Sequence, residues 1–389
     1  MKVKNYIFYI GVIFTYACTP SENSIYEFDP RIFKGKEFTL SAIADDIIYV
    51  PLENTFPLGR IVKTVFTKDA IYLSSVDIGI LRYDREGNFI NKIGNIGRGP
   101  GEYIFYMFFC VDDNTGKVYN ISDGSERIQV FSPNGKLIRS FLPLDQGTSI
   151  SNILLYNSDL FIQCAIEWED ANYEWMFYDT LGNIIKKQKR HLPYFYNNSS
   201  GAGYPYIYKD KLSYYNSWTD TVFSILPDLT EIPSMTLSSG EHRFPRSYVP
   251  MEDISQKKYF ILSKIFETER FLVIKYYYRK YSLALIDKKN QATFLDHYEW
   301  DEGLNGHPVS GVINDLDGGS WFLPDGHFIK DGNEYMTGLQ YPFQIISRVA
   351  SDEFKNSAPK YPEKKKELEK LAASLKETDN PVIVMVKLK

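Results

Sequence analysis

Short apolar runs alternate with turn signals along most of the chain, and this pattern predicts strands rather than helices. One unit recurs in which two such runs flank a polar turn containing a glycine, at 82–90, 130–138 and 177–185. The glycines of these turns are Gly87, Gly135 and Gly182, which lie 48 and 47 residues apart. A period of this length is typical of the blade of a β-propeller.

Weaker copies of the unit follow at 222–232 and 283–295 and near 321–329. The repetitive region extends from about residue 57 to 349 and holds six units of this period. One small twisted sheet cannot bury both of its faces, whereas radial stacking gives each sheet two neighbours. The sequence therefore predicts six four-stranded blades.

The two ends of the chain are expected to close this ring. Apolar stretches at 47–50 and 382–386 both read as strands, and pairing them within one blade removes exposed edges. A helix is predicted near 362–378, where Leu368, Leu371 and Leu375 share one face and charged residues form a solvated face. The predicted fold is all-β: a six-bladed β-propeller over 36–389 with terminal-strand closure and one short C-terminal helix.

Composition narrows the functional classes. The 389 residues include 44 Lys and Arg against 49 Asp and Glu, and the resulting net charge of −5 gives no reason to expect a nucleic-acid partner. The hydrophobic share of 44% and the charged share of 24% fit a folded protein, neither disordered nor polytopic. An aromatic share of 16%, with 30 Tyr and 26 Phe, again favours strands.

The N-terminus has the features of an export signal. Lys2 and Lys4 precede a short apolar stretch over 6–14, and a small residue stands before Cys18. The position of Cys18 resembles the lipobox of bacterial lipoproteins, so we expect a signal peptide at 1–17 and a lipidated tether at 18–35; a plain cleaved signal is the alternative. The predicted location is the outer membrane, periplasmic or surface-facing, with membrane contact through the lipid anchor only. Cys110 and Cys164 are expected to be two buried thiols, although an exported protein can oxidise such a pair.

Three segments resemble a known family. The run Gly97, Arg98, Gly99, Pro100, Gly101, Glu102, Tyr103 is similar to the GRGPGEY motif of the six-bladed β-propeller lipoproteins of the Bacteroidetes, which are related in architecture to NHL-type propellers. The segment 315–319, with Phe322 and Pro324, resembles that family's DGG segment, and 380–389 resembles its closing strand. The resemblance implies a fold and a location, and no common activity.

The glycine-rich motif supplies the first candidate site. Its glycines permit close approach of a ligand, so Arg98 and Glu102 can be placed at the mouth of the central channel, where Arg grips a carboxylate or phosphate. The alternative is a tight crossover between blades in which Arg98 and Glu102 pair with each other or with backbone. The motif is not a P-loop, because the Lys-Ser/Thr ending is missing.

Acidic turns and histidines are weaker candidates. Asp315 and Asp317, like Asp112 and Asp113, offer oxygen ligands to a hard cation, but turns in which they bond local amides are favoured. The five histidines lack metal-binding spacing, and no GxSxG is present. No metal and no cofactor are therefore expected.

Aromatic residues near acids and amides are the most suggestive feature of a binding protein. Tyr194, Tyr196 and Trp168 can stack on sugar rings, and Trp321 stands close to Asp317 in sequence; packing between blades is the alternative. We expect a binding or interaction scaffold for a glycan or peptide at the channel mouth, rather than an enzyme. The alternatives are a lyase or hydrolase that uses Arg98, Glu102 and Asp317, and a structural subunit with an exposed apolar patch.

Overall fold

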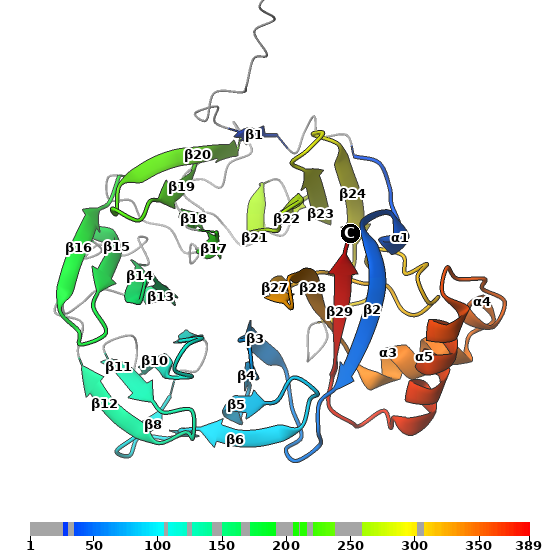
Figure 1. Ribbon diagram of the computed structural model, residues 1–389, viewed down its shortest axis with the longest axis horizontal. Coiled ribbons are helices and arrows are strands. Elements are labelled where there is room, and N and C mark those ends of the chain that lie inside the picture. The colour runs from blue at the N-terminus through cyan, green and yellow to red at the C-terminus, as the bar shows by residue number, and fades with distance from the viewer. Residues whose placement is uncertain are drawn as a thin grey trace, which may run out of the picture.

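Six small sheets stand around a common axis in the computed structural model (Figure 1). The structure describes residues 26–29, 35–104, 108–122, 127–141, 150–164, 172–191, 205–209, 211–215, 221–237, 259–301 and 307–389. The predicted six-bladed β-propeller is confirmed. Cys110 and Cys164 are buried thiols, as expected. Within the described part of the chain, no helix has the length and apolar character needed to cross a membrane.

Five blades consist of four consecutive antiparallel strands ordered from the axis to the rim. Blade 1 contains β3 (Ile61–Phe66), β4 (Ile71–Ser75), β5 (Gly79–Tyr83) and β6 (Phe89–Ile93). Blade 2 contains β9 (Phe109–Val111), β10 (Val118–Ser122), β11 (Arg127–Phe131) and β12 (Leu137–Phe141). Blade 3 contains β13 (Ile150–Tyr156), β14 (Asp159–Cys164), β15 (Tyr173–Tyr178) and β16 (Ile184–Lys189). Blade 4 contains β17 (Tyr206–Tyr208), β18 (Lys211–Tyr215), β19 (Thr221–Ile225) and β20 (Glu231–Leu237), and blade 5 contains β21 (Ile261–Glu267), β22 (Phe271–Tyr278), β23 (Lys280–Asp287) and β24 (Thr293–Tyr298).

Blade 6 is built from both ends of the chain, as the sequence predicted. Its inner strands are β27 (Gly326–Lys330) and β28 (Asn333–Gln340), followed outward by β29 (Val382–Leu388) and β2 (Ala44–Pro51). The pairing of β2 with β29 is antiparallel and extends from Ala44 opposite Leu388 to Pro51 opposite Val382. This pairing closes the ring, so that every blade has a neighbour on each face.

The repeated glycines lie at matching corners of successive blades. Gly87, Gly135 and Gly182 each lie in the hairpin between the third and fourth strands, with φ of 92°, 78° and 98°. Each hairpin also contacts the end of the preceding blade's outer strand: a Cβ on Gly135 would lie 2.0 Å from the Lys92 carbonyl oxygen. Glycine is required at this corner because both the backbone conformation and the close approach exclude a side chain.

Two described segments before β2 contact three blades, and we call residues 26–29 and 35–43 together the N-terminal belt. Its first strand, β1 (Tyr26–Phe28), pairs in parallel with β20 on the rim of blade 4. Lys36 then bridges to Phe294 of blade 5, and α1 (Leu40–Ile43) leads into β2. Phe28 is only 1% exposed. Within the predicted tether at 18–35, the described residues 26–28 are thus packed against the propeller.

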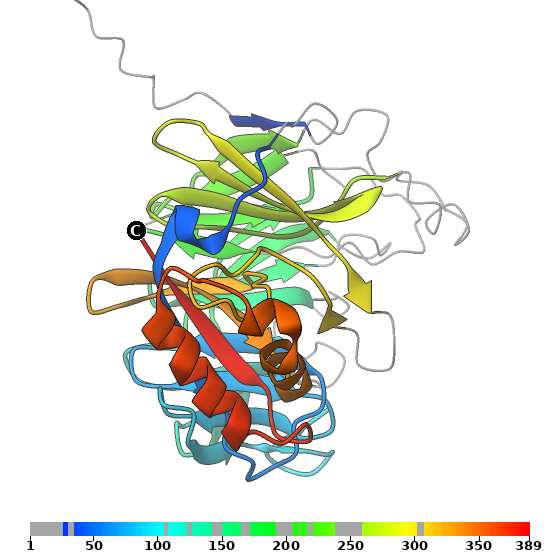
Figure 2. The ribbon, with the colours of Figure 1, turned by 90° about the vertical axis from the view of Figure 1, so that its right-hand side faces the viewer.

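Three helices cover the outside of blade 6 (Figure 2). They are α3 (Pro342–Ala350), α4 (Asp352–Lys355) and α5 (Pro362–Ser374), all between β28 and β29. Ile345, Phe354 and Leu368 are buried together with Val382 of the closing strand. The sequence predicted α5 and missed α3, whose β-branched residues and position in the repeat resemble those of a strand.

Substituting Gly135 by Ala tests the docking of hairpins between blades. The matched control is Gly332→Ala, because Gly332 also has a positive φ of 74° but a Cβ there would meet nothing within 4 Å. We expect Gly332→Ala to cost about 1 kcal/mol from backbone strain, and Gly135→Ala about 3 kcal/mol or more from strain plus the steric clash. Denaturant unfolding of both variants measures the difference. Equal losses would mean that the contact with Lys92 does not matter.

Candidate functional site

The glycine-rich motif forms the crossover from blade 1 to blade 2. Within it β7 (Asn95–Ile96) pairs in parallel with β8 (Glu102–Tyr103), and Figure 1 shows β8 at the outer rim, away from the axis. Glu102 Oε2 accepts a hydrogen bond from Gly99 N at 2.7 Å. Arg98 is exposed, and no ion pair joins it to Glu102 in this described segment. The arrangement matches the crossover alternative, and it does not place Arg98 or Glu102 at the channel mouth.

The motif owes its composition to this crossover. A Cβ on Gly97 would lie 2.1 Å from Glu102 Oε2, so a side chain there would displace the carboxylate. The hydroxyl of the buried Tyr103 accepts from Ile80 N at 2.9 Å and donates to Ile93 O at 2.7 Å. Tyr103 thus fixes the crossover to two strands of blade 1.

Asp317 is fully buried next to the helices of blade 6. Its carboxylate accepts from Gly319 N at 2.8 Å and from Asn314 Nδ2 at 2.6 Å, and burial raises its pKa. Asp315 accepts from the side chains of Thr39 and Ser41 and so fastens the N-terminal belt. The two acids therefore bond their own turn and the belt, as the alternative reading of this segment predicts.

The remaining candidates from the sequence do not join these residues in one site. Trp321 is partly buried, packs on the core between blades 5 and 6, and its carbonyl accepts from Gln340 Nε2 at 2.7 Å. Arg98, Glu102 and Asp317 do not converge, because the first two lie on the crossover after blade 1 and Asp317 is enclosed at blade 6. Trp168, Tyr194 and Tyr196 lie outside the described residues, as does Cys18.

The other acidic pair also forms a turn. Asp112 accepts from Asn114 N at 3.0 Å and from the Thr115 hydroxyl, and Asp113 accepts from Lys68 N at 2.7 Å. Within the ranges that the structure describes, no group of three or more His, Cys, Asp or Glu side chains is arranged to hold a metal ion.

Exposed aliphatic residues recur on the outer strands of blades 1 to 3. Ile90, Ile138 and Ile185 occupy the same position after the glycine turn and are 43%, 49% and 46% exposed. Single exposed aliphatic residues, one on each of three separate blades, are ordinary on a protein surface, so these three residues give no support to the structural-subunit alternative.

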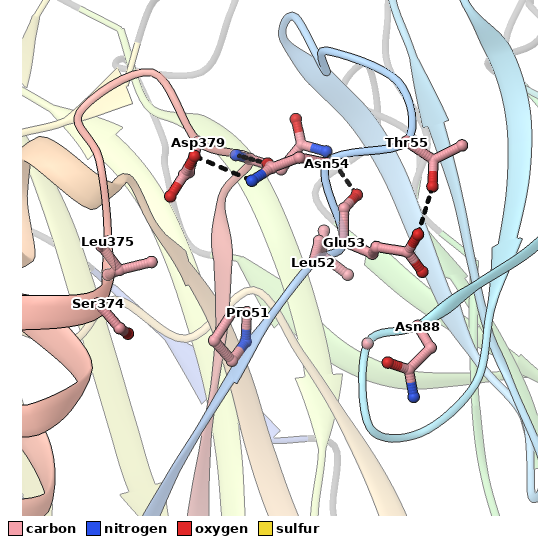
Figure 3. A pocket seen from close by; sticks show the side chains of 11 residues that line it. Pro51, Leu52, Glu53, Asn54, Thr55, Asn88, Ser374, Leu375 and Asp379 are labelled. Atoms are coloured by element: carbon pink, nitrogen blue, oxygen red, sulfur yellow. Dashed lines mark hydrogen bonds between the residues drawn. The ribbon is translucent and has the colours of Figure 1, made fainter.

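A groove of about 600 Å³ lies where blade 6 meets blade 1 (Figure 3). Its lining residues are Pro51, Leu52, Glu53, Asn54, Thr55, Gly87, Asn88, Ser374, Leu375, Asp379 and Asn380. The polar groups here already bond each other: Asn380 Nδ2 donates to the carbonyls of Glu53 and Phe56, both at 2.8 Å, and Asn380 Oδ1 accepts from Leu58 N at 2.8 Å. These hydrogen bonds join blade 6 to the start of blade 1, and we call this junction the seam of the ring.

Substituting Asn380 by Ala tests this seam. Asn380 is 3% exposed, so its loss leaves two carbonyls and one amide without their partner. We expect a loss of about 2–4 kcal/mol in the free energy of unfolding. Asn88→Ala in the same groove is the control, since Asn88 is exposed and bonds only within its own turn. A small effect of Asn380→Ala in denaturant unfolding would show that the seam is not needed.

A cluster of charged side chains lies at the axis of the ring, and we call Lys63, Asn152, Lys264, Lys275 and Asp325 the axial cluster. Lys63, Asn152 and Lys264 come from β3, β13 and β21, the innermost strands of blades 1, 3 and 5, and Asp325 directly precedes β27 (Figure 1). Lys264 Nζ is 3.0 Å from Asp325 Oδ2, and Lys275 Nζ is 3.1 Å from Asp325 Oδ1. Lys63 Nζ reaches Asn152 Oδ1 at 3.4 Å.

A repeated irregularity of the inner strands places three of these residues. The pairing register shifts between Ile61 and Lys63, between Ile150 and Asn152, and between Leu262 and Lys264. Bulges of this kind re-aim side chains and often stand next to functional sites. Lys63 and Asn152 are the third residues of their strands, Lys264 is the fourth of seven, and Asp325 precedes β27, so the axial cluster lies in the half of the channel nearer the end at which the chain enters these strands.

Solvent reaches the axial cluster. The side chain of Asp325 is 55% exposed and that of Lys264 is 32% exposed, although Lys275 is only 10% exposed. Burial alone would raise the pKa of Asp325, but the adjacent Lys264 and Lys275 hold it well below its usual range. Three lysines face one carboxylate, so the cluster carries a net charge of +2 when all four groups are ionised.

Lys63 is held in an environment that disfavours its charge. Burial, and to a lesser extent the like charge of Lys264, lower its pKa from 10.5 to about 8. Sequence reasoning missed this residue and its partners. The available signal was a single lysine within the mainly apolar strands IVKTVF and ILSKIFE, a position where Lys is rarely found without a reason.

Replacing Lys63 by Met is expected to stabilise the protein at pH 7. Below pH 8 the folded state bears the cost of the buried charge; between pH 8 and 10.5 the folded protein loses this proton while the unfolded chain keeps it, so the cost disappears. The advantage of Lys63→Met over the wild type in urea unfolding should therefore shrink from pH 7 to pH 9.5. Lys366→Met, at an exposed position, should show no such trend. If the stability difference between Lys63→Met and the wild type stayed constant with pH, it would contradict the lowered pKa of Lys63.

The comparisons with known proteins give the family and support the fold. The model of the family described as Domain of unknown function (DUF4934) matches residues 24–387. The chain belongs to this family. A search of curated proteins found no similar sequence.

Two solved structures resemble this DUF4934 chain. A predicted exported protein (BF0058) from Bacteroides fragilis is 16% identical, with a TM-score of 0.64 over 94% of this chain and 100% of that one. A member of the duf4221 family from Bacteroides vulgatus is 12% identical, with a TM-score of 0.50 over 89% of this chain and 97% of that one. At these identities the likeness concerns the fold alone.

Proposed function

We propose that this DUF4934 protein is an exported, lipid-anchored propeller that acts as a binding scaffold, with its ligand at the mouth of the channel where the axial cluster lies. The axial cluster is the observation that carries this proposal. Charged side chains from blades 1, 5 and 6 converge there, and solvent reaches Asp325 and Lys264 among them, whereas Glu102 and Asp317 bond their own turns. A solvent-reached group of converging polar side chains is the usual character of a ligand site.

The ligand class that we propose is a glycan or a peptide. Aromatic rings of blade 5 stand beside the axial cluster: Lys275 Nζ lies 6.0 Å from the centre of the Tyr298 ring, and Tyr281 stacks on Tyr298 at 5.5 Å. Trp300 follows at 6.5 Å from Tyr281 and is 39% exposed. Rings and charges that meet in this way suit a ligand with both flat and polar parts.

Binding of oligosaccharide and peptide arrays tests the scaffold. We expect the wild type to retain ligands from one array, and Asp325→Asn with Lys264→Met to lose them at least tenfold, because both partners of the 3.0 Å ion pair are removed together. The control is the exposed pair Lys366→Met with Glu369→Gln on α5. Equal retention by both double variants would show that the ligand does not bind at the axis.

The proposed location rests on the N-terminal sequence and is supported by the description of the Bacteroides fragilis neighbour as exported. A lipid on Cys18 would be separated from Tyr26, the first residue of β1, by eight residue steps, which span at most about 28 Å. Because β1 lies on the rim of blade 4, the rim of that blade would then face the membrane.

Mass spectrometry of the protein expressed in a Bacteroides host tests the anchor. We expect the mature chain to begin at Cys18 with the added mass of acyl chains, and Cys18→Ala to appear in the soluble fraction. Ser21→Ala is the control, since it leaves the cysteine in place. A mature chain that begins elsewhere, or an unmodified Cys18, would contradict the anchor and leave the binding site unaffected.

A further inference from the structure

We propose that Lys63 and Lys264 together hold a small, doubly charged oxyanionic group at the axis of the propeller. This inference rests on the proposed binding site and names the chemistry of the part of the ligand that enters it. The shared chemistry is that of a phosphate group or of a dicarboxylate, which Lys side chains bind as point charges.

Lys63 is the lysine of the axial cluster that has no carboxylate partner among the described residues. Asp325 has two carboxylate oxygens, and each already contacts one ammonium group, Oδ2 that of Lys264 and Oδ1 that of Lys275. For Lys63 the described residues supply only an amide oxygen, Asn152 Oδ1, at the long distance of 3.4 Å. A partly buried ammonium with so weak a partner is costly unless an anion joins it.

The groups around Lys63 do not provide that anion. The neighbouring thiol of Cys110 on β9 has its pKa raised to about 12 by burial, so it is neutral at pH 7. The ring of Phe109 lies 5.5 Å from Lys63 Nζ. Lys264 on β21 carries a like charge, which lowers the pKa of Lys63. An anion between Lys63 and Lys264 would turn this repulsion into two attractions.

A second observation comes from the strand next to Lys63. Ser74 on β4 is the register partner of Lys63, so the two side chains lie on the same face of blade 1. Ser74 is 0% exposed, and its hydroxyl has no hydrogen-bond partner among the described residues. Buried hydroxyls in proteins nearly always have a partner. Ser74 therefore leaves one donor available beside Lys63, as an oxyanion would require.

The geometry also limits the kind of anion. The axial cluster contains Lys and no Arg, so it lacks the planar fork that reads a carboxylate in two fixed hydrogen bonds. Asp325 stands between Lys264 and Lys275 and repels an anion from that side. An anion is therefore expected on the side of Lys264 that faces Lys63, and the net charge of +2 matches a dianion.

Calorimetric titration of the whole protein with inorganic phosphate and with succinate tests this inference. We expect saturable binding of at least one anion at pH 7 and low salt, with a tenfold or greater loss of affinity in Lys63→Met and in Lys264→Met. Lys366→Met is the charge-matched control and should bind as the wild type does. Binding of phosphate alone identifies a phosphate-type ligand, and binding of succinate alone a dicarboxylate.

The pH dependence provides a second readout. Because Lys63 must be charged to bind, the affinity of the wild type should fall as the pH rises above about 8. In Ser74→Ala, whose side chain differs by one hydroxyl, we expect a smaller loss of about threefold. Circular dichroism confirms that each variant is folded.

The outcomes separate this inference from the proposed function. If neither anion binds, or if Lys63→Met binds as tightly as the wild type, the oxyanion site is wrong. Should array ligands still depend on Lys264 and Asp325 in that case, the scaffold proposal stands without it. An equal loss in Lys366→Met would reveal non-specific charge attraction and would overturn the site.

Discussion

The antiparallel pairing of β2 with β29 is the constraint on which the rest of the molecule depends. Each blade is a small sheet that buries both faces only when it has two neighbours. Blade 6 separates blade 5 from blade 1, and its two outer strands come from opposite ends of the chain. Because Asn380 bonds the segment that leads from β2 to blade 1, the closing strand also fixes the start of the next blade.

The rim and the axis of the ring have different roles. Along the rim, glycine corners, the crossover with Tyr103 and the N-terminal belt join neighbouring blades through hydrogen bonds and close backbone contacts. At the axis, by contrast, the inner strands carry charged groups whose mutual pairing is incomplete. The contacts that join the blades are thus concentrated at the rim, and the proposed binding site lies at the axis. Burial lowers the pKa of Lys63, so its charge is expected to lower the stability of the folded state.

The fold could be predicted from the sequence because the hairpin between the third and fourth strands of a blade requires glycine, and this hairpin recurs at a fixed spacing. Gly87, Gly135 and Gly182 each need a positive φ and an absent side chain, and this demand is visible without any structure. The site could not be found in this way. Lys63 and Asn152 are 89 residues apart and meet only because the ring is closed. The conspicuous residues Arg98 and Asp317 were instead explained by a crossover and by a buried turn. Likewise, no local pattern marked Tyr26–Phe28 as a strand of blade 4, because its partner lies more than two hundred residues away.

Strand β29 follows every other described strand along the chain, so β2 stays without its partner until residues 382–388 have been synthesised. A product cut short before residue 382 keeps five blades but exposes unpaired strand edges in blade 6. We expect such a truncated chain to misfold and to become accessible to proteases, because the pairing that closes the ring is missing.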